Sequence, residues 1–184
     1  MLHFLYPYAC AGSVFSIDYR KLYRMGFRGI LFDIDNTLVH HGDDSTAEVD
    51  DLFRFLHHIG LKTLLLTNNS EERVKRFIKH IDTLYLCGAD KPKPGGYRKA
   101  MALMELEPKE VLCIGDQIFT DILGANRSGL ASILVPFIRL DHETKLGKRR
   151  QLERIILYFY RHSPSYYNRL GEIEVSHSNS QKSQ

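Results

Sequence analysis

The fold class of this 184-residue chain is decided by the stretch Gly29-Ile30-Leu31-Phe32-Asp33-Ile34-Asp35-Asn36-Thr37. The predicted strand, Gly29–Ile34, is apolar up to Asp33 and does not alternate with polar residues, which is typical of a strand buried on both faces of a parallel sheet. Asp33 and Asp35 are two residues apart, so on extended backbone they point the same way. Carboxylates at the end of a buried strand are costly, which indicates either a loop-capping pair or a chemical role.

Four further apolar runs continue this pattern along the chain. They are Leu61–Leu66, Leu84–Leu86, Val111–Ile114 and Ala131–Val135. Between the strands, apolar residues recur at helical spacing in the segments Ser45–Ile59, Ser70–His80, Gly95–Leu106 and Thr120–Ser128. Ser45 and Glu48 predict a capping box, Ser70 an N-cap and Gly129 a helix end. The alternation predicts an α/β fold with a doubly wound, Rossmann-like parallel sheet of about five strands flanked by helices.

Composition places the chain among soluble globular proteins, with 43% hydrophobic and 26% charged residues. Three cysteines without a CxxC pair argue against a disulfide framework or a zinc site and fit a reducing compartment. No run of 18 apolar residues suggests a membrane span, and the start, MLHFLYPYACAG, lacks the basic residues of a signal peptide. We therefore expect a cytoplasmic protein, with a peripheral position at the inner membrane surface as an open alternative.

Positive charge gathers near the end of the chain, with seven Lys or Arg and one Glu from Lys145 to Arg169. This distribution predicts four parts: an N-terminal lead-in helix or loop at 1–28, the α/β core at 29–140, a basic C-terminal helix at 141–170 and a polar, disordered tail at 171–184.

Three more polar segments each follow a predicted strand. They are Leu66-Thr67-Asn68-Asn69, Lys91-Pro92-Lys93-Pro94 and Gly115-Asp116-Gln117-Ile118-Phe119-Thr120-Asp121. Singly, they fit a helix start, a loop and a first-turn helix charge. Because parallel strands end at one edge of a sheet, the set predicts a hydroxyl, an ammonium group and two more carboxylates beside Asp33. An aspartate that attacks phosphorus needs such a cation, and a second carboxylate can protonate the leaving oxygen and later activate water.

In their order, DIDNT, the Thr67 of LLTNN, KPKP and GDQIFTD resemble the four motifs of the haloacid dehalogenase-like (HAD) phosphatase superfamily, over roughly Gly29–Pro136. The resemblance implies that Asp33 is the nucleophile and Asp35 the general acid and base. Asp35 also separates phosphatases from the dehalogenase branch, which lacks it. Asp116 would bind Mg²⁺ together with Asp33 and the backbone carbonyl of Asp35, a ligand set that suits this ion. Asp121 would hold the metal's waters or the motif lysine.

The same resemblance assigns the phosphoryl-binding groups. Thr67 would bind a phosphoryl oxygen, and the backbone N–H groups near Ile34 and Asn68 could take others. Both Lys91 and Lys93 precede a proline, as the motif lysine does. The first lysine of a K-P-x-P pattern is the reactive one in the family, which favours Lys91.

About 30 residues separate Thr37 from Thr67, and the segment from Asn69 to Lys91 is shorter, so neither gap accommodates a cap domain. A site without a cap is open to large or surface-presented substrates, unless a neighbouring copy covers it.

GDQIFTDILGANRSGLASILV and SIDYRKLYRMGFRGILFDIDNTLV are similar to the YqeG-type branch of the superfamily (subfamily IIIA), which is related to mitochondrial phosphatidylglycerophosphate phosphatases. That implies a phosphomonoester substrate, with a lipid head group as one option and a soluble sugar or nucleotide phosphate as another. A catalytically weak binding or scaffold protein is the rival, although a scaffold would not need Asp35.

The segment Lys145–Arg161 predicts an amphipathic helix with Arg150, Arg154 and Arg161 on one face. Its apolar positions are Leu152, Ile155, Ile156 and Phe159. Such a helix either lies on an anionic membrane surface or packs against the sheet with its basic face in water. Nucleic acid is a weaker option, because no binding motif accompanies the charge.

Overall fold

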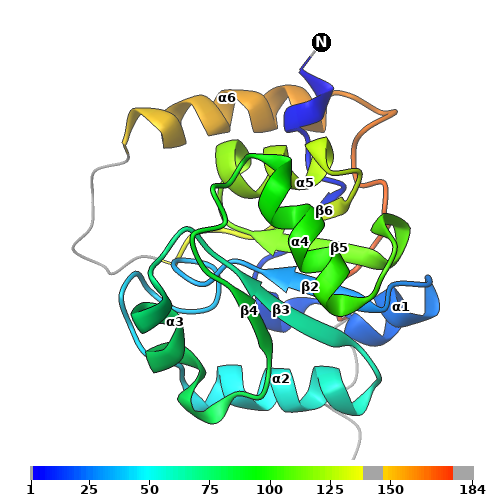
Figure 1. Ribbon diagram of the computed structural model, residues 1–184. Helices are drawn as coiled ribbons and strands as arrows, with labels where there is room; N and C mark the ends of the chain where they lie inside the picture. The colour runs from blue at the N-terminus through cyan, green and yellow to red at the C-terminus, as the bar shows by residue number, and fades with distance from the viewer. Residues whose placement is uncertain (1, 139–146, 176–184) are drawn as a thin grey trace, which may run out of the picture.

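Six parallel strands form the central sheet of the structure, a computed structural model that describes residues 2–138 and 147–175 (Figure 1). The strands are β1 (Ala9–Cys10), β2 (Gly29–Phe32), β3 (Lys62–Leu66), β4 (Leu84–Leu86), β5 (Val111–Gly115) and β6 (Ala131–Leu134). They lie in the order β1-β6-β5-β2-β3-β4, and every neighbouring pair is parallel. The expected doubly wound α/β fold is confirmed, with β2 and β5 adjacent at its centre.

The sixth strand, β1, was not predicted. It pairs with β6 at the edge of the sheet, Ala9 beside Ile133 and Cys10 beside Leu134. Two residues are too few to show a strand pattern, so the sequence predicted only a lead-in helix or loop for the segment 1–28. It instead supplies an edge strand, and hydrophobic residues such as Val14 and Leu22 in it are buried.

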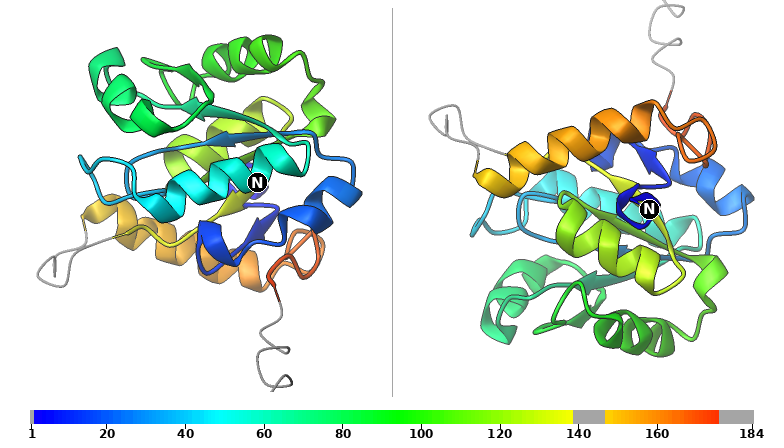
Figure 2. Two further views of the ribbon diagram at one scale, coloured as in Figure 1. Left: turned by 90° about the horizontal axis from the view of Figure 1, so that it is seen from below. Right: turned by 90° about the horizontal axis from the view of Figure 1, so that it is seen from above.

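Helices cover both faces of the sheet, as the two views in Figure 2 show. One layer contains α1 (Tyr19–Arg24), α2 (Ala47–His58) and α3 (Glu71–Phe77), and the other contains α4 (Pro94–Met104), α5 (Leu123–Arg127) and α6 (Lys148–Arg161). Side chains of β2 alternate between the layers, since Ile30 and Phe32 belong to the first core and Leu31 to the second. Apolar cores therefore cover both faces of the sheet, and the polar site residues lie at the strand ends.

The predicted N-cap is confirmed for α3 and is wrong for α2. Ser70 caps α3, accepting a hydrogen bond from the backbone N–H of Arg73. The cap of helix α2 lies one residue later than predicted, because Thr46 is the cap and accepts from Val49 N–H at 3.3 Å. The Ser45 capping box is wrong: the Ser45 hydroxyl donates to the Asp50 carboxylate instead.

The predicted helix Thr120–Ser128 begins as a π-helical turn, Ile118–Ile122, which continues into α5. Gly129 follows its end at φ +76°, as the sequence predicts for a helix terminus. Residues 171–175, expected to be part of a disordered tail, are paired with the N-terminal segment. Glu174 bridges Ile17, and Asp18 N–H donates to the buried Ile173 carbonyl at 2.7 Å. The remaining tail, 176–184, lies outside the described residues, as do 139–146.

Helix α6 presents a different face to the protein from the one its spacing suggests. Glu153, Ile156 and Tyr160 are buried, and of the four predicted apolar positions only Ile156 is among them. Leu152, Ile155 and Phe159 are each about half exposed, at 49%, 54% and 48%. The expectation of a packed apolar face with a basic face in water is therefore wrong for these three residues.

In the described ranges no helix is long and apolar enough to cross a bilayer. The chain between Asp33 and Thr67 holds only a loop, α2 and β3, and the chain from Asn68 to Lys91 holds α3, a single 3₁₀ turn and β4. Neither segment, both of which are fully described, contains an inserted domain.

Candidate active site

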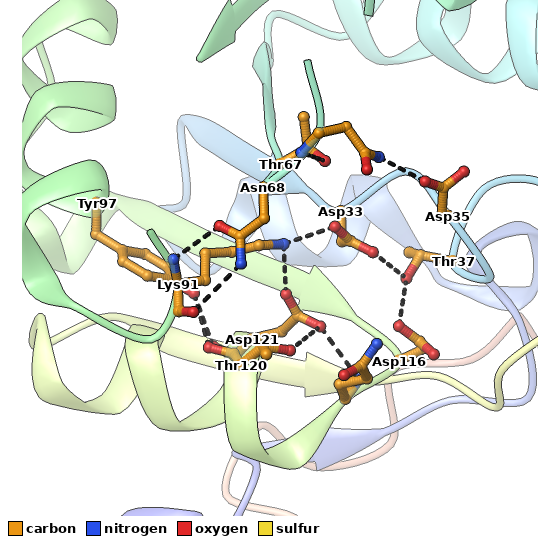
Figure 3. A network of polar contacts seen from close by, with 12 residues as sticks. Asp33, Asp35, Thr37, Thr67, Asn68, Lys91, Tyr97, Asp116, Thr120 and Asp121 are labelled. Carbon is orange, nitrogen blue, oxygen red and sulfur yellow. Dashed lines mark hydrogen bonds and ion pairs between the residues drawn. The ribbon is translucent and has the colours of Figure 1, made fainter. Parts of the chain in front are cut away.

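The ends of four strands bring the predicted site residues together at one edge of the sheet (Figure 3). Asp33 directly follows β2, Thr67 follows β3, Lys91 lies in the loop after β4 and Asp116 follows β5. Side chains of Asp33 and Lys91 point toward one another between these strands, with Asp121 beneath them. The residues that the sequence pattern predicted to lie at one edge of the sheet therefore do lie close together in the structure.

Lys91 occupies the centre of this cluster. Its Nζ donates to Asp33 Oδ1 at 2.6 Å and to Asp121 Oδ1 at 2.7 Å, and its side chain is 5% exposed. Burial alone would lower the pKa of the ammonium group, but the charges of Asp121 and Asp33 outweigh it and hold that pKa above its usual value. Lys91 is therefore a fixed positive charge beside Asp33. Lys93 lies outside the site and pairs with Asp90 at 2.7 Å in solvent.

Asp121 is fixed by the π-helical turn that carries it. Its Oδ2 accepts from Gln117 N–H at 3.1 Å, and the Tyr97 hydroxyl donates to the carbonyl oxygens of Thr120 and Asp121. Gly115 permits this close approach, because a Cβ there would lie 2.4 Å from Asp121 Cγ. With one oxygen on Lys91 and the other on Gln117, Asp121 is placed to hold the lysine.

The carboxylates of Asp33 and Asp116 both lie beside the Thr37 hydroxyl, next to Lys91. The Thr37 hydroxyl lies 3.5 Å from Asp33 Oδ2 and 3.4 Å from Asp116 Oδ1. One carboxylate oxygen from each of Asp33, Asp116 and Asp121 lies within 4.8 Å of the other two. Burial raises the pKa of Asp33 to about 7, against the lowering effect of Lys91, and burial and the Asp121 charge raise the pKa of Asp116 to about 6, against Arg150. Crowded, buried carboxylate oxygens of this kind suit a hard divalent cation such as Mg²⁺.

Arg150 of α6 also reaches this cluster, which the sequence did not indicate. Its guanidinium donates to the Asp116 carboxylate, to the Asp116 carbonyl oxygen at 2.5 Å and to Glu153 Oε2 at 3.0 Å. Glu153 is buried and its Oε1 accepts from Ile118 N–H at 2.8 Å. The placement of Arg150 on the outer basic face of the helix is therefore wrong; the arginine joins α6 to the candidate site.

Asp35 turns away from Asp33 into its own set of donors. Its Oδ1 accepts from Gly42 N–H at 3.0 Å and from Arg73 Nη2 at 2.9 Å, while its Oδ2 accepts from the Asn69 amide at 2.5 Å. Desolvation raises the pKa of Asp35, but the hydrogen bonds from Gly42, Arg73 and Asn69 outweigh it and leave the pKa below its usual value. Asn36, in the left-handed region at φ 64°, turns the chain directly after it.

Arg73 is a second residue that the sequence analysis missed. It lies on α3, and its side chain is 11% exposed. Besides Asp35, its Nη2 bonds the Asp43 carbonyl, whereas its buried Nε and Nη1 have no hydrogen-bond partner among the described residues. A charged group held in this way stabilises the ionised form of Asp35.

The predicted phosphoryl-binding groups lie around the Lys91 cluster. Thr67 is buried, and its hydroxyl accepts from Asn69 N–H at 3.2 Å. The Asn68 side-chain amide forms two hydrogen bonds with the Lys91 backbone. Its Oδ1 accepts from the Lys91 N–H at 2.8 Å, and its Nδ2 donates to the Lys91 carbonyl at 3.3 Å. Within the described chain, no hydrogen bond uses the backbone N–H of Ile34 or of Asn68. These two donors remain available to a ligand at the strand ends.

Comparisons with known proteins agree with this geometry. Residues 41–129 match the family model described as haloacid dehalogenase-like hydrolase, a segment that begins after Asp35 and includes Thr67, Lys91, Asp116 and Asp121. The probable phosphatase YqeG of Bacillus subtilis (strain 168) is 34% identical over 155 residues, which cover 84% of this chain and 90% of that protein.

Two further proteins extend the comparison. The phosphatidylglycerophosphate phosphatase 1 of Arabidopsis thaliana, chloroplastic/mitochondrial, is 25% identical over 168 residues, 84% of this chain and 47% of that protein. Among solved structures, NagD from E. coli K-12 superposes with a TM-score of 0.54 at 15% identity, over 67% of this chain and 94% of that one, which supports the fold alone. From the family model, the similarity to YqeG and the fold, the chain belongs to the haloacid dehalogenase-like hydrolases and is a phosphatase of that family.

Proposed function

We propose that this phosphatase is a Mg²⁺-dependent phosphomonoester hydrolase that transfers the phosphoryl group to Asp33 before water releases it. The observation that carries the proposal is the position of Lys91, which Asp121 holds against one oxygen of Asp33. The other oxygen of Asp33 and one oxygen of Asp116 both lie beside the Thr37 hydroxyl. This arrangement supplies a nucleophile, a fixed cation and a second pair of oxygens for a metal within one buried cluster.

Each group then has a role that its contacts support. Asp33 Oδ2, Asp116 Oδ1 and the Asp35 carbonyl would hold the ion, which supplies charge neutralisation for the attack of an anionic nucleophile on an anionic phosphoryl group. Lys91 and the free N–H groups of Ile34 and Asn68 would bind the phosphoryl oxygens, with the Thr67 hydroxyl beside them. Phosphoryl transfer requires little more than such positioning and charge stabilisation.

Asp35 would serve the two proton transfers. In the first step it would give a proton to the leaving oxygen, and in the second it would take one from the water that attacks the aspartyl-phosphate. Its carboxylate now bonds Arg73 and Asn69. To reach the leaving oxygen, the side chain would turn away from these donors toward the phosphoryl group, and Arg73 thus tunes how readily it carries the proton.

The fully described segment between Asp33 and Lys91 holds no inserted domain that could cover the site, which supports a large or surface-presented substrate. The A. thaliana relative is named for a lipid phosphomonoester, phosphatidylglycerophosphate. We therefore place a phosphomonoester on a lipid head group first among the substrates, ahead of soluble sugar and nucleotide phosphates.

The outer face of α6 supports contact with an anionic membrane, at the inner surface of which the protein would act. Leu152, Ile155 and Phe159 form an exposed apolar stripe, and Arg149 and Arg161 are exposed on the same helix. A helix with apolar residues turned outward beside basic ones is typical of an interfacial helix.

Phosphate release from a panel of lipid, sugar and nucleotide phosphomonoesters, with and without Mg²⁺, tests the proposal. Asp33→Asn is the control. We expect wild-type protein with Mg²⁺ to hydrolyse at least one class and the variant to hydrolyse none. Hydrolysis that is unchanged by EDTA, or by the substitution, would refute the metal or the nucleophile respectively.

A further inference from the structure

The two carboxylate oxygens of Asp116 have different surroundings. Arg150 Nη2 donates to Asp116 Oδ2, and Arg150 Nη1 donates to the Asp116 carbonyl oxygen at 2.5 Å. The other carboxylate oxygen, Oδ1, lies 3.4 Å from the Thr37 hydroxyl, which is itself 3.5 Å from Asp33 Oδ2. The Arg150 guanidinium therefore holds one oxygen of Asp116, and the second oxygen lies on the side of the nucleophile.

Arg150 is itself fixed by its neighbours. Its Nη1 also donates to Glu153 Oε2 at 3.0 Å, and Glu153 Oε1 accepts from Ile118 N–H at 2.8 Å. The guanidinium carbon lies 4.6 Å from the centre of the Phe137 ring. The side chains of Arg150 and Glu153 are 19% and 8% exposed, and that of Asp116 is 0% exposed, so water competes little for these contacts. A planar guanidinium held in this way keeps its orientation toward Asp116.

The neighbouring carboxylates also have oxygens that the protein occupies. Lys91 Nζ donates to Asp33 Oδ1 at 2.6 Å and to Asp121 Oδ1 at 2.7 Å. Asp121 Oδ2 accepts from Gln117 N–H at 3.1 Å. Among the described residues, no cation and no backbone N–H holds Asp33 Oδ2 or Asp116 Oδ1. Each of these two carboxylates can therefore offer one oxygen to an ion.

The number of oxygens that a carboxylate offers distinguishes Mg²⁺ from Ca²⁺. Mg²⁺ is small and octahedral, keeps several waters and is bound through one or two carboxylates. Ca²⁺ is larger, takes six to eight oxygens and commonly binds both oxygens of a carboxylate. If Asp116 were to bind an ion through both oxygens, Oδ2 would have to leave Arg150, which would break a charge-assisted hydrogen bond in a buried place. The site therefore disfavours the ion that gains more from the second oxygen.

We infer that Arg150 determines the choice of ion: by holding Asp116 Oδ2 it limits Asp116 to one ligating oxygen and favours Mg²⁺ over Ca²⁺. The inference rests on the proposed function, since it requires that the ion binds at Asp33 and Asp116. Arg150 acts through Asp116, so it is a positioning residue. Its place on α6 makes that helix a part of the metal site.

Calorimetric titration of the metal-free protein with Mg²⁺ and with Ca²⁺ tests the inference without an activity assay. Loss of the Arg150 charge strengthens the attraction for both divalent ions alike, so the ratio of the two Kd values isolates the number of oxygens. We expect Arg150→Met to lower Kd(Ca²⁺)/Kd(Mg²⁺) about tenfold, a size typical of changes to groups that orient a metal ligand. Arg150→Lys should retain part of the preference, because it keeps the charge but not the paired contacts.

Arg154→Gln is the matched control, because Arg154 is exposed on the same helix and the substitution removes the same charge. It should leave the ratio unchanged. Asp116→Asn should weaken the binding of both ions and so locate the heat signal at this site. An equal ratio in wild-type protein and Arg150→Met would overturn the inference, as would an equal shift in Arg150→Met and Arg154→Gln.

A crystal structure of wild-type protein grown with Mg²⁺ tests the same point if Arg150→Met does not fold. We expect the ion on Asp116 Oδ1 and the guanidinium of Arg150 still on Oδ2. An ion bound to both oxygens, or Arg150 displaced from Asp116, would refute the assignment of Arg150 while the metal-dependent function stands. If wild-type protein binds neither ion, the proposed metal dependence fails first, and the role of Arg150 with it.

Discussion

Lys91 lies with its ammonium nitrogen 2.6 Å from the carboxylate of Asp33. The strand end that carries Asp33 and the loop that carries Lys91 are separated by 58 residues of sequence, yet both groups are almost completely buried and the contact is direct. A buried ion pair of this kind is weak grounds for stability, because desolvation offsets much of the attraction. Its position on the predicted nucleophile points instead to charge stabilisation during phosphoryl transfer.

The two lysines of the KPKP segment give the first prediction. Lys91→Met should lower kcat by about a hundredfold or more, because it removes a transition-state charge. Lys93→Met should stay within about twofold, since its exposed ion pair with Asp90 contributes little. The measurement is p-nitrophenyl phosphate hydrolysis, with melting temperatures to confirm folding. A larger loss at Lys93 than at Lys91 would show that the wrong lysine has been assigned.

Arg73 gives the second prediction, through Asp35. Replacing it with Met removes a donor that lowers the pKa of Asp35, so that pKa should rise. The pH profile of kcat/KM for an alkyl phosphate, whose leaving oxygen needs a proton, should then move to higher pH. The profile for p-nitrophenyl phosphate should move less, and Arg73→Lys should shift both less than Arg73→Met. Identical pH profiles in wild type and Arg73→Met would show that Arg73 does not lower the pKa of Asp35.

Metal binding should depend on pH between about 5.5 and 7.5. The pKa values of Asp33 and Asp116 are raised to about 7 and about 6, so the metal-free folded protein keeps protons that the unfolded chain has lost. The contribution of these groups to the free energy of unfolding therefore falls as pH rises through that window. Mg²⁺ competes with those protons, so the melting temperature should gain more from Mg²⁺ at pH 7.5 than at pH 5.5.

Asp116→Asn is the control for this pH effect and should reduce the gain at both pH values. An equal gain in wild-type protein at pH 5.5 and pH 7.5 would contradict binding of the ion at these carboxylates.

The apolar stripe of α6 gives a prediction about membranes. Leu152→Ser, Ile155→Ser and Phe159→Ser together should abolish sedimentation with anionic vesicles, and Arg149→Gln with Arg161→Gln should weaken it and increase its sensitivity to salt. Neither variant should change p-nitrophenyl phosphate hydrolysis by more than about twofold, because these residues face away from the site. Wild-type protein that ignores anionic vesicles at low salt would exclude the membrane surface and favour a soluble substrate.

The predictable strands are those that form separate apolar runs between helical segments, and they include the three-residue β4, which has the predicted bounds Leu84–Leu86. The runs around Ile30, Leu64 and Cys113 are apolar without alternation, and the structure has β2, β3 and β5 there with ends shifted by one or two residues. Strand β1 could not be predicted, because its two residues gain their order from pairing with β6, a contact more than 120 residues away. The cap of α2 depended on whether Ser45 or Thr46 took the terminal position, which local sequence does not decide.

The candidate site also contains residues that could be predicted from the sequence and residues that could not. Asp33, Thr67, Lys91 and Asp116 follow strands, so the topology of a parallel sheet was enough to bring them together. Arg73 and Arg150 lie on helices, and only tertiary packing turns them toward Asp35 and Asp116. The pattern on α6 was misleading for a similar reason: the helix buries Glu153, Ile156 and Tyr160, and a buried acid such as Glu153 looks like a surface residue in sequence. The one signal for Arg150 was the local excess of positive charge.

The covalent step is the central claim, and trapping the acyl phosphate measures it most directly. Wild-type protein and Asp33→Asn would be mixed with Mg²⁺ and substrate, quenched in acid within a turnover and reduced with borohydride, which converts an aspartyl-phosphate to homoserine. Peptide mass spectrometry then locates the reduced residue. The account predicts homoserine at position 33 in wild-type protein, dependent on substrate and absent from the variant. Reduction at another aspartate, or phosphate release without any reduced residue at position 33, would contradict it.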